Sequence, residues 1–477
     1  MKLLNRQLSP AHHSRATKSK RRRTLQHSAT NHHNCTKRQK ITFSEETETL
    51  TRRAGQSPKP PTSNRFELVH SSKQRRKSRK RRDSSATTAG HRRWTFSSRD
   101  FSNFKDKFVV VSYNILGVEN ALKHPDLYSR VKPEFLEWDR RKKLICEEIN
   151  RYNASILCFQ EVDRFDDLDD LLQKDGFRSV YKARTGDAYD GCAVFWRDNI
   201  FSLLHQEDIE FRNFGLRHNV AQLCVLKINS NLPESEIQEQ SSIQSLVVGN
   251  IHVLFNPNRG DIKLGQVRLF LEKAYKLSEE YGGIPVLLAG DMNSSPQSAI
   301  YQFLASSELD IQKHDRRYIS GQVELPSNRR DFRFQNWNAT SGWMSNSRQL
   351  IHRWSDEELR HATGSYGVTQ LQHQLKLCSA YFGVPGSCRT RDSSSEPLAT
   401  SYHTKFMGTV DYIWHTEDLL PVRVLETLPI DTLRRTAGLP CERWGSDHLA
   451  LGCELAFANN DLQVDRSEIY LRVVIRS

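Results

Sequence analysis

Polar side chains that can bind a metal ion or a phosphate stand at the ends of several apolar segments of the sequence. These side chains stand in SYN (112–114), QE (160–161), NIH (250–252), GDMN (290–293), TVD (409–411) and SDH (446–448). Hydrolysis of a phosphodiester needs charge neutralisation at the phosphoryl oxygens, a group that activates water, and stabilisation of the leaving oxygen. Carboxylates, amides and imidazoles supply these functions, so the pattern indicates hydrolysis of a phosphate ester.

Glu161 is the expected ligand of a magnesium ion. It follows the apolar segment SILCFQ, and neither of its immediate neighbours in the sequence is basic. Magnesium prefers oxygen ligands, and a carboxylate at the end of a buried strand supplies them. The alternative interpretation is a surface or helix-capping glutamate.

The segment GDMN follows the apolar run VLLA directly. Asp291 can position or deprotonate a water molecule, and Asn293, two residues on, can donate its amide to a phosphate oxygen. Gly290 permits a close approach of the backbone. Taken alone, the segment is also typical of an ordinary turn, because Gly, Asp and Asn are common turn residues.

Asp411 and His448 form the expected acid–imidazole pair. A carboxylate fixes the tautomer of an imidazole, which then polarises the scissile phosphate or protonates the leaving group. Asp447, next to His448, is a further candidate metal ligand. The alternative for a single histidine near a strand is a structural role in the core.

Strands and helices must alternate to bring these segments together. Apolar and β-branched runs predict strands, and apolar residues at helical spacing predict helices at 137–152 and 262–281. The expected strands begin with one from residue 108 and continue at 155–162, 191–197, 219–228, 246–254, 284–291, 409–415 and 448–455. This order is typical of two stacked sheets flanked by helices.

The basic residues gather near the N-terminus. Residues 1–100 contain 26 Lys and Arg against 6 Asp and Glu, whereas the remainder contains 44 against 50. This segment is also poor in apolar residues, so we expect a disordered basic tail over 1–104. Its runs at 18–23 and 73–82 suit nuclear import or contact with nucleic-acid phosphates, and a solvated tail is the alternative.

Three further sequence features limit the possible organisation of the chain. The polar segment 310–374 is expected to be a surface insertion, and residues 461–477 a C-terminal extension. The nine cysteines include no CxxC pair, which argues against a zinc site or a disulfide framework. No apolar run is long enough for a membrane span.

The ordered set SYNIL, QEV, DGCAVF, NIHVLFNP, LLAGDMNSSP, KFMGTVDYIW and GSDHLAL resembles the endonuclease/exonuclease/phosphatase superfamily. More narrowly, it resembles the catalytic domain of carbon catabolite repressor deadenylases, a group close to nocturnin and the Angel proteins. The resemblance implies an α/β fold, a four-layer α/β/β/α sandwich, over residues 105–460. It also implies one or two Mg²⁺ ions and a substrate of single-stranded RNA 3′ ends, poly(A) above all.

The resemblance assigns a role to each matching position. Glu161 would be the principal magnesium ligand, and His252 would bind the scissile phosphate. The residues around the metal and phosphate would be Asn114, Asp291, Asn293 and Asp447, with Asp411 and His448 as the orienting pair. Pro257 and Phe406 would sandwich a base, with Asn256 standing where many relatives have aspartate before the proline.

Other functions stay open at this point. The same residues could hydrolyse a small nucleotide such as NADP or a 2′,5′-linked oligoadenylate, or the fold could serve as a catalytically silent RNA-binding scaffold. Leucine-rich repeats are absent from the first hundred residues, so docking onto a larger deadenylase complex through them is not expected. The expected location is the nucleus and cytoplasm. An organelle is the alternative, because residues 1–44 are Arg-rich and lack Asp and Glu.

Overall fold

The computed structural model describes residues 92–104, 106–229, 244–322 and 354–458. The two basic runs before residue 92 and the expected C-terminal extension lie outside the described residues, as does the middle of the expected insertion. None of the helices in the described ranges combines the length and the apolar character that crossing a membrane requires.

The described chain alternates strands with helices. The helices are α1 (Val118–Lys123), α2 (Trp138–Tyr152), α3 (Phe165–Lys174), α4 (Gly260–Glu280), α5 (Ala299–Ser306), α6 (Asp356–Thr363) and α7 (Ile430–Leu433). The strands up to the middle of the chain are β1 (Trp94–Phe96), β2 (Lys107–Asn114), β3 (Ile156–Gln160), β4 (Phe177–Ala183), β5 (Gly191–Arg197), β6 (Phe201–Glu210), β7 (Val220–Ile228), β8 (Ser245–His252) and β9 (Val286–Asp291). The later strands are β10 (Glu308–Asp310), β11 (Gln370–Gln372), β12 (Leu377–Ser379), β13 (Ser401–His403), β14 (Phe406–Gly408), β15 (Asp411–Thr416), β16 (Leu419–Leu425) and β17 (Leu451–Phe457).

Two large mixed sheets form the centre of the domain. The first has seven strands in the order β1-β16-β17-β2-β3-β5-β4, and the second has six in the order β12-β15-β9-β8-β7-β6. Each sheet contains one parallel pair, β2 with β3 and β8 with β9, and its other pairs are antiparallel. Both parallel pairs deliver their C-terminal ends to the candidate site.

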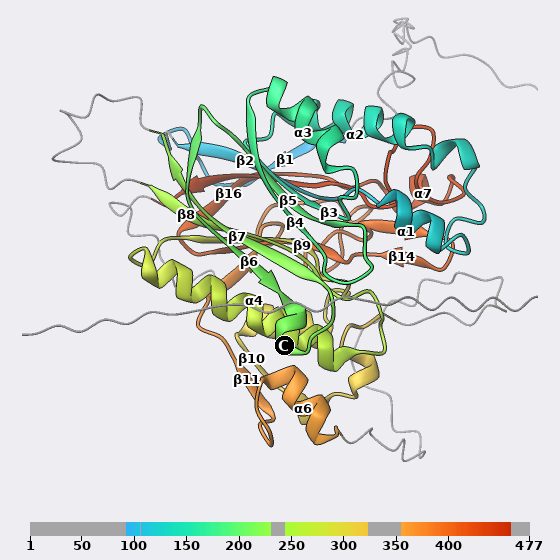
Figure 1. The fold of residues 1–477 in the computed structure, drawn as a ribbon. Coiled ribbons are helices and arrows are strands. Elements are labelled where there is room, and N and C mark those ends of the chain that lie inside the picture. The colour runs from blue at the N-terminus through green and yellow to red at the C-terminus, as the bar shows by residue number, and fades with distance from the viewer. Residues whose placement is uncertain (1–91, 105, 230–243, 323–353, 459–477) are drawn as a thin grey trace, which may run out of the picture. The chain divides into compact units, whose positions relative to one another are not determined.

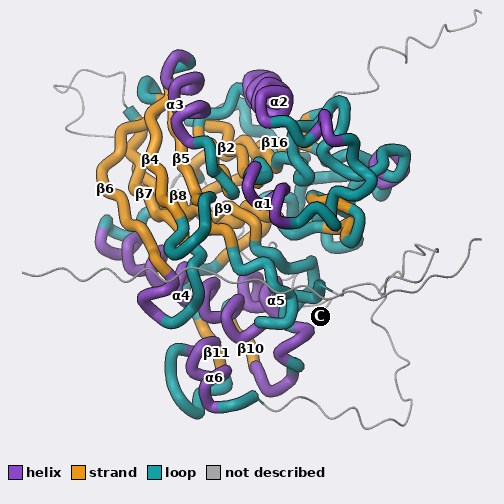
Figure 2. The backbone as a smooth tube through the Cα atoms, turned by 45° about the vertical axis from the view of Figure 1, so that its right-hand side comes forward, coloured by secondary structure: helices purple, strands orange, loops and turns teal. Residues whose placement is uncertain are grey.

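Side-chain alternation along the strands shows that the central strands of both sheets are buried on both faces. Phe108 and Val110 of β2 point into the core between the sheets, while Val109 and Val111 pack against α2 and α3. On β9, Leu287 points into the core between the sheets, whereas Leu288 packs toward α4 and α5. The order is helices, sheet, sheet, helices, as Figures 1 and 2 show with α2 and α3 on one side and α4 on the other. The predicted four-layer α/β/β/α sandwich is confirmed.

The expected N-terminal boundary at residue 104 is wrong. Strand β1 pairs antiparallel with β16, with Trp94 opposite Leu425, and Phe101 and Phe104 are buried against Leu420 of β16. These aromatic residues supply the apolar area that the rest of the basic segment lacks. The folded domain therefore begins by residue 92.

The prediction that residues 310–374 form a surface insertion is wrong for the two ends of this stretch. Ile311, Ile319 and Leu359 are buried in the same core as α4 and α5, and α6 packs on α4. Strand β11 pairs with β10 just outside the large sheets. The stretch is polar overall, so its few apolar residues did not indicate from sequence that it packs into the core.

Candidate active site

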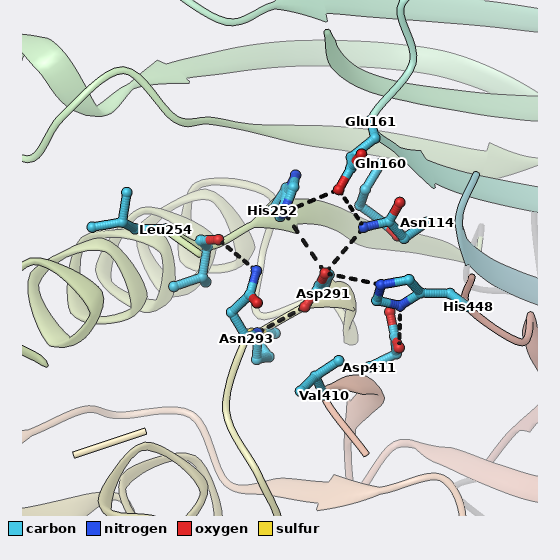
Figure 3. Close-up of polar contacts among 12 residues, drawn as sticks. Asn114, Gln160, Glu161, His252, Leu254, Asp291, Asn293, Val410, Asp411 and His448 are labelled. Atoms are coloured by element: carbon cyan, nitrogen blue, oxygen red, sulfur yellow. Dashed lines mark hydrogen bonds and ion pairs between the residues drawn. The ribbon is translucent and has the colours of Figure 1, made fainter. Parts of the chain in front are cut away.

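Strand register brings the predicted site residues together at one end of the two sheets. In the second sheet, His252 and Asp411 are both register partners of Asp291, one from each neighbouring strand. In the first sheet, Asn114 is paired with Gln160, the residue before Glu161. Figure 3 shows the side chains from both sheets pointing toward one another. The predicted convergence is confirmed.

The end of β9 positions Asp291 and Asn293. A Cβ on Gly290 would lie 2.0 Å from the carbonyl oxygen of Ile251, so only glycine lets β9 lie against β8 here, as predicted. Asp291 Oδ1 accepts a hydrogen bond of 2.8 Å from the backbone N–H of Asn293. Asn293 adopts a left-handed conformation, and its Nδ2 donates to the carbonyl of Val253 at 3.0 Å. The second hydrogen of this amide stays available for a substrate oxygen.

Glu161 is held by donors on its own side of the site. Its Oε2 accepts from the N–H of Gly117 at 3.0 Å and from Asn120 Nδ2 at 2.8 Å, and Asn114 Nδ2 donates to its Oε1 at 3.0 Å. Burial favours the neutral acid, but His252 and these amides outweigh burial and lower the pKa of Glu161. Its backbone is left-handed (φ 57°), a strained conformation for glutamate that is typical of functional sites.

Asn114 links the two sheets at the site. Its Nδ2 donates to Glu161 and also to Asp291 Oδ2, the latter at 3.1 Å, while its Oδ1 accepts from the N–H of Leu116. His252 lies between the same two carboxylates, with its Nε2 at 3.9 Å from Glu161 Oε1 and 3.7 Å from Asp291 Oδ2. These four side chains surround one small space.

Asp411 and His448 form the predicted pair. His448 Nδ1 lies 2.8 Å from Asp411 Oδ2, and its Nε2 lies 3.9 Å from Asp291 Oδ2. Burial alone lowers the pKa of His448, but Asp411 and Asp447 raise it, and the net result is a pKa well above the usual value. The raised pKa favours the protonated form of His448, whose Nε2 faces Asp291.

Asp447 is buried beside this pair. Its Oδ2 accepts a hydrogen bond of 2.9 Å from the hydroxyl of Tyr128. Burial, with a further contribution from the charge of Glu161, raises the pKa of Asp447 to about 6. Two buried carboxylates that repel one another in this way are stabilised by a cation between them.

The donor set fits a hard divalent cation. Glu161 and Asp447 offer carboxylate oxygen atoms, the ligands that Mg²⁺ prefers. The predicted ligand Asn114 instead directs its Nδ2 to Glu161 and Asp291 and its Oδ1 to the N–H of Leu116. Among the described residues, Asp291, Asp411 and His448 also place ligand atoms within 4.8 Å of one another. Asp411 and His448 already bind each other, so a metal ion fits better on the side of Glu161.

A cleft of about 200 Å³ lies above these groups. Glu161, His252, Asp291, Asn293, Asp447 and His448 line its floor. Its walls carry Phe406, which lies 6.0 Å from the ring of His403, and Phe255, which lies 6.2 Å from the ring of His124. Asn114 and Asp411 stand behind the lining residues and support them.

The predicted base-binding residues divide into two groups. Phe406 begins β14 and lines the cleft, as the base-stacking hypothesis requires. Asn256 and Pro257 lie in the loop after β8, and neither is among the lining residues in this structure; their neighbour Phe255 is. The geometry therefore gives Asn256 and Pro257 no direct place at the cleft.

Several supporting residues were missed because their partners are distant in sequence. Lys263 of α4 is fully buried, and its Nζ donates to the carbonyl of Asn293 at 2.6 Å and to Gln322 Oε1 at 2.8 Å. Below the site, Gln160 Nε2 of the first sheet donates to Asn250 Oδ1 of the second at 2.8 Å. Only the polar character of Gln160 and Asn250 within apolar strands could have indicated this contact.

Comparison with known proteins agrees with this geometry. The model of the Endonuclease/Exonuclease/phosphatase family matches residues 111–448. Carbon catabolite repressor protein 4 homolog 5 of Arabidopsis thaliana is 62% identical over 394 residues, which cover 82% of this chain and 86% of that protein. Homolog 3 of the same plant is 49% identical over 352 residues, covering 74% and 75% of the two chains.

A solved structure shares the fold. The crystal structure of ANGEL2, described as a 2′,3′-cyclic phosphatase in complex with adenosine-2′,3′-vanadate, superposes with a TM-score of 0.61 at 28% identity, covering 77% of this chain and 99% of that chain. The family match spans every strand end that contributes to the site floor. The chain belongs to the endonuclease/exonuclease/phosphatase family of hydrolases, within the group of carbon catabolite repressor protein 4 homologues.

Proposed function

We propose that this chain is a magnesium-dependent 3′-exoribonuclease that shortens poly(A) tails. One observation carries the proposal. Carboxylate, amide and imidazole groups suited to phosphodiester hydrolysis form the floor of a cleft whose walls carry Phe255 and Phe406. Stacking on aromatic side chains is the usual way in which proteins hold bases of single-stranded RNA, and it suits the large face of adenine.

In the proposed reaction Asp291 activates water. Burial and the neighbouring Asp411 raise its pKa above the ordinary value, which makes it a stronger base than an exposed aspartate. Its Oδ1 accepts from the N–H of Asn293 and its Oδ2 from Asn114; we assign the proton to Oδ2, because this oxygen faces His252 and His448.

His448 and Asn293 bind the phosphoryl group. The imidazolium of His448 is oriented by Asp411 through Nδ1, which leaves Nε2–H to donate to a phosphoryl oxygen. The free hydrogen of the Asn293 amide donates to a second oxygen. Fixed donors of this kind stabilise the charge that develops as the bond to the leaving oxygen breaks.

Glu161 and Asp447 would hold the divalent cation, and the amide of Asn114 orients Glu161. When bound, the cation supplies neutralisation of charge on the phosphoryl and leaving oxygens. His252, between Glu161 and Asp291, completes the surroundings of the scissile phosphate. Phe406 is the proposed stacking partner of the terminal adenine.

A direct test uses the full chain and an RNA of 20 mixed nucleotides followed by a tail of 20 adenosines, labelled at its 5′ end. With Mg²⁺, the proposal expects a ladder of products that shorten one nucleotide at a time and slow at the tail boundary. The Glu161→Gln variant serves as the matched inactive control. Intact RNA after prolonged incubation with fresh Mg²⁺ would refute the proposal.

A second function is favoured by the similarity to ANGEL2. That protein is described as a 2′,3′-cyclic phosphatase and is covered over 99% of its length. The same floor could hydrolyse a cyclic phosphate at an RNA end without removing a nucleotide. Comparing RNAs that end in a 3′-hydroxyl or a 2′,3′-cyclic phosphate separates the two: shortening supports the exonuclease, and loss of the terminal phosphate ester at constant length supports the second.

A further inference from the structure

Four side chains form a continuous row that starts at the cleft wall and that we call the outer rim: Phe255, His124, Lys123 and Tyr189. Phe255 and His124 belong to the cleft wall, with ring centroids 6.2 Å apart. Lys123, next to His124 at the end of α1, places its Nζ 4.8 Å from the centroid of the Tyr189 ring. The rim therefore runs outward from the cleft without interruption.

The rim is exposed although its members are large and partly apolar. Phe255 is 49% exposed and Tyr189 is 63% exposed, and Lys123 and His124 are exposed as well. Aromatic side chains that stay in solvent next to a binding cleft are typical of a surface that meets a ligand. Lys123 is exposed, and its ammonium group lies against the ring of Tyr189.

The scaffold fixes the rim relative to the site floor. Gly117 and Asn120, at the beginning of α1, both donate hydrogen bonds to Glu161, so the helix that carries Lys123 is tied to the proposed metal ligand. Tyr189 precedes Asp190, whose buried carboxylate pairs with Arg184 of the cleft wall at 3.2 Å. The positions of the floor and the outer rim relative to each other are therefore fixed before a ligand binds to both.

We propose that the outer rim binds the nucleotides that lie upstream of the scissile phosphate in a single-stranded RNA. The inference rests on the proposed function, because that function places the RNA 3′ end in the cleft. The cationic Lys123 lies between the His124–Phe255 ring pair and the ring of Tyr189, as a phosphate lies between neighbouring bases along the strand. The rim lies outside the floor, so its contribution grows with RNA length and does not affect the bond-breaking step.

The test measures binding apart from hydrolysis. Fluorescently labelled oligoadenylates of 2 and 20 nucleotides are titrated with the full chain in the Glu161→Gln background, and affinity is read from anisotropy. Tyr189→Ala is expected to weaken binding of the 20-mer by roughly 5- to 150-fold, the usual worth of one base–aromatic stack. Lys123→Ala is expected to reduce the slope of log affinity against log salt by about 0.7, the loss of one phosphate contact.

Phe96→Ala is the matched control. Phe96 is an exposed aromatic residue beside a cation, Arg423, but it lies on β1, and neither residue lines the cleft or adjoins a lining residue in the sequence. The variant should bind both RNAs like the parent, and the 2-mer should bind equally to all variants. If Tyr189→Ala and Lys123→Ala bind the 20-mer like the control, or if the parent does not bind it, the rim inference is overturned.

Hydrolysis of the same 20-mer by the unmutated chain is scored separately. If the 20-mer is hydrolysed but its binding does not depend on the rim residues, the proposed role of the outer rim is refuted and the proposed function is not. Rim-dependent binding without hydrolysis supports the rim as an RNA surface and refutes the proposed exonuclease.

Discussion

Replacing Lys263 with methionine tests how the floor of the cleft is supported. The side chain is fully buried, and its Nζ holds the carbonyl of Asn293 and the side chain of Gln322. Burial lowers the pKa of Lys263 from 10.5 to about 7. Methionine has a similar length but carries neither the charge nor the donors, so the Lys263→Met variant removes both the contact and the titration.

The sign and size of the effect follow from that pKa. Because the folded-state pKa of Lys263 lies below its value in the unfolded chain, the unfolded chain binds the proton more tightly, and stability rises with pH between the two values. At roughly 1.4 kcal/mol per pKa unit, the contribution of Lys263 to the free energy of unfolding should grow by about 3–4 kcal/mol from pH 7 to pH 10. The methionine variant lacks this gain.

Urea unfolding followed by tryptophan fluorescence, at pH 7, 8, 9 and 10 in the presence of EDTA, measures the difference between parent and variant. Other groups titrate equally in both proteins, so the difference isolates Lys263. Lys276→Met, on the same helix with a side chain 76% exposed, should show no such pH dependence. At pH 7 the Lys263→Met variant should also lose roughly 10- to 100-fold in kcat, because Asn293 is no longer held in place. Parallel stability curves for parent and Lys263→Met would refute the reasoning.

Three further substitutions test the floor and wall of the cleft. Glu161→Gln should lower kcat by orders of magnitude and weaken Mg²⁺ binding in calorimetry, while its melting temperature stays near that of the parent; undiminished Mg²⁺ affinity would exclude Glu161 as a ligand. Asp411→Asn removes the charge that raises the pKa of His448, so the alkaline limb of the pH–rate profile should move to lower pH and kcat at pH 7.5 should fall by about 10²–10⁴. An unchanged pH–rate profile would show that the protonation of His448 does not control the reaction rate. Phe406→Ala should weaken binding of an RNA that ends in adenosine by about 1–3 kcal/mol, and equal affinity would contradict stacking.

The main strands and the long helices could be predicted from sequence because their apolar patterns are local. β2, β5, β8 and α4 lie where the sequence indicates them, since buried strands and an amphipathic helix need no distant partner to be identified. Strand β1 was missed because its residues lie at the end of a basic segment, and pairing with β16, more than 300 residues away, determines its structure.

The site residues, like the strands, could be predicted only where a local pattern indicates them. Asp291, Asp411 and His448 could be placed together because each ends or adjoins an apolar strand. The hydrogen bond from Tyr128 to Asp447 joins residues separated by 319 positions, and no local pattern carries that information. The left-handed backbone of Glu161 was equally hidden, because glutamate has no preference for that conformation.

The hydrogen bonds from Asn114 to Asp291 and from Gln160 to Asn250 cross from one sheet to the other. Each sheet holds only half of the reactive groups, so the rate of hydrolysis reports how accurately the two halves of the molecule are docked. A substitution such as Leu287→Ala, in the layer between them, would shift one half against the other and silence the enzyme at temperatures where its helices and strands are still intact. Activity would then be lost at a lower temperature than secondary structure, and the rate of hydrolysis would be a more sensitive measure of sheet-to-sheet packing than thermal unfolding.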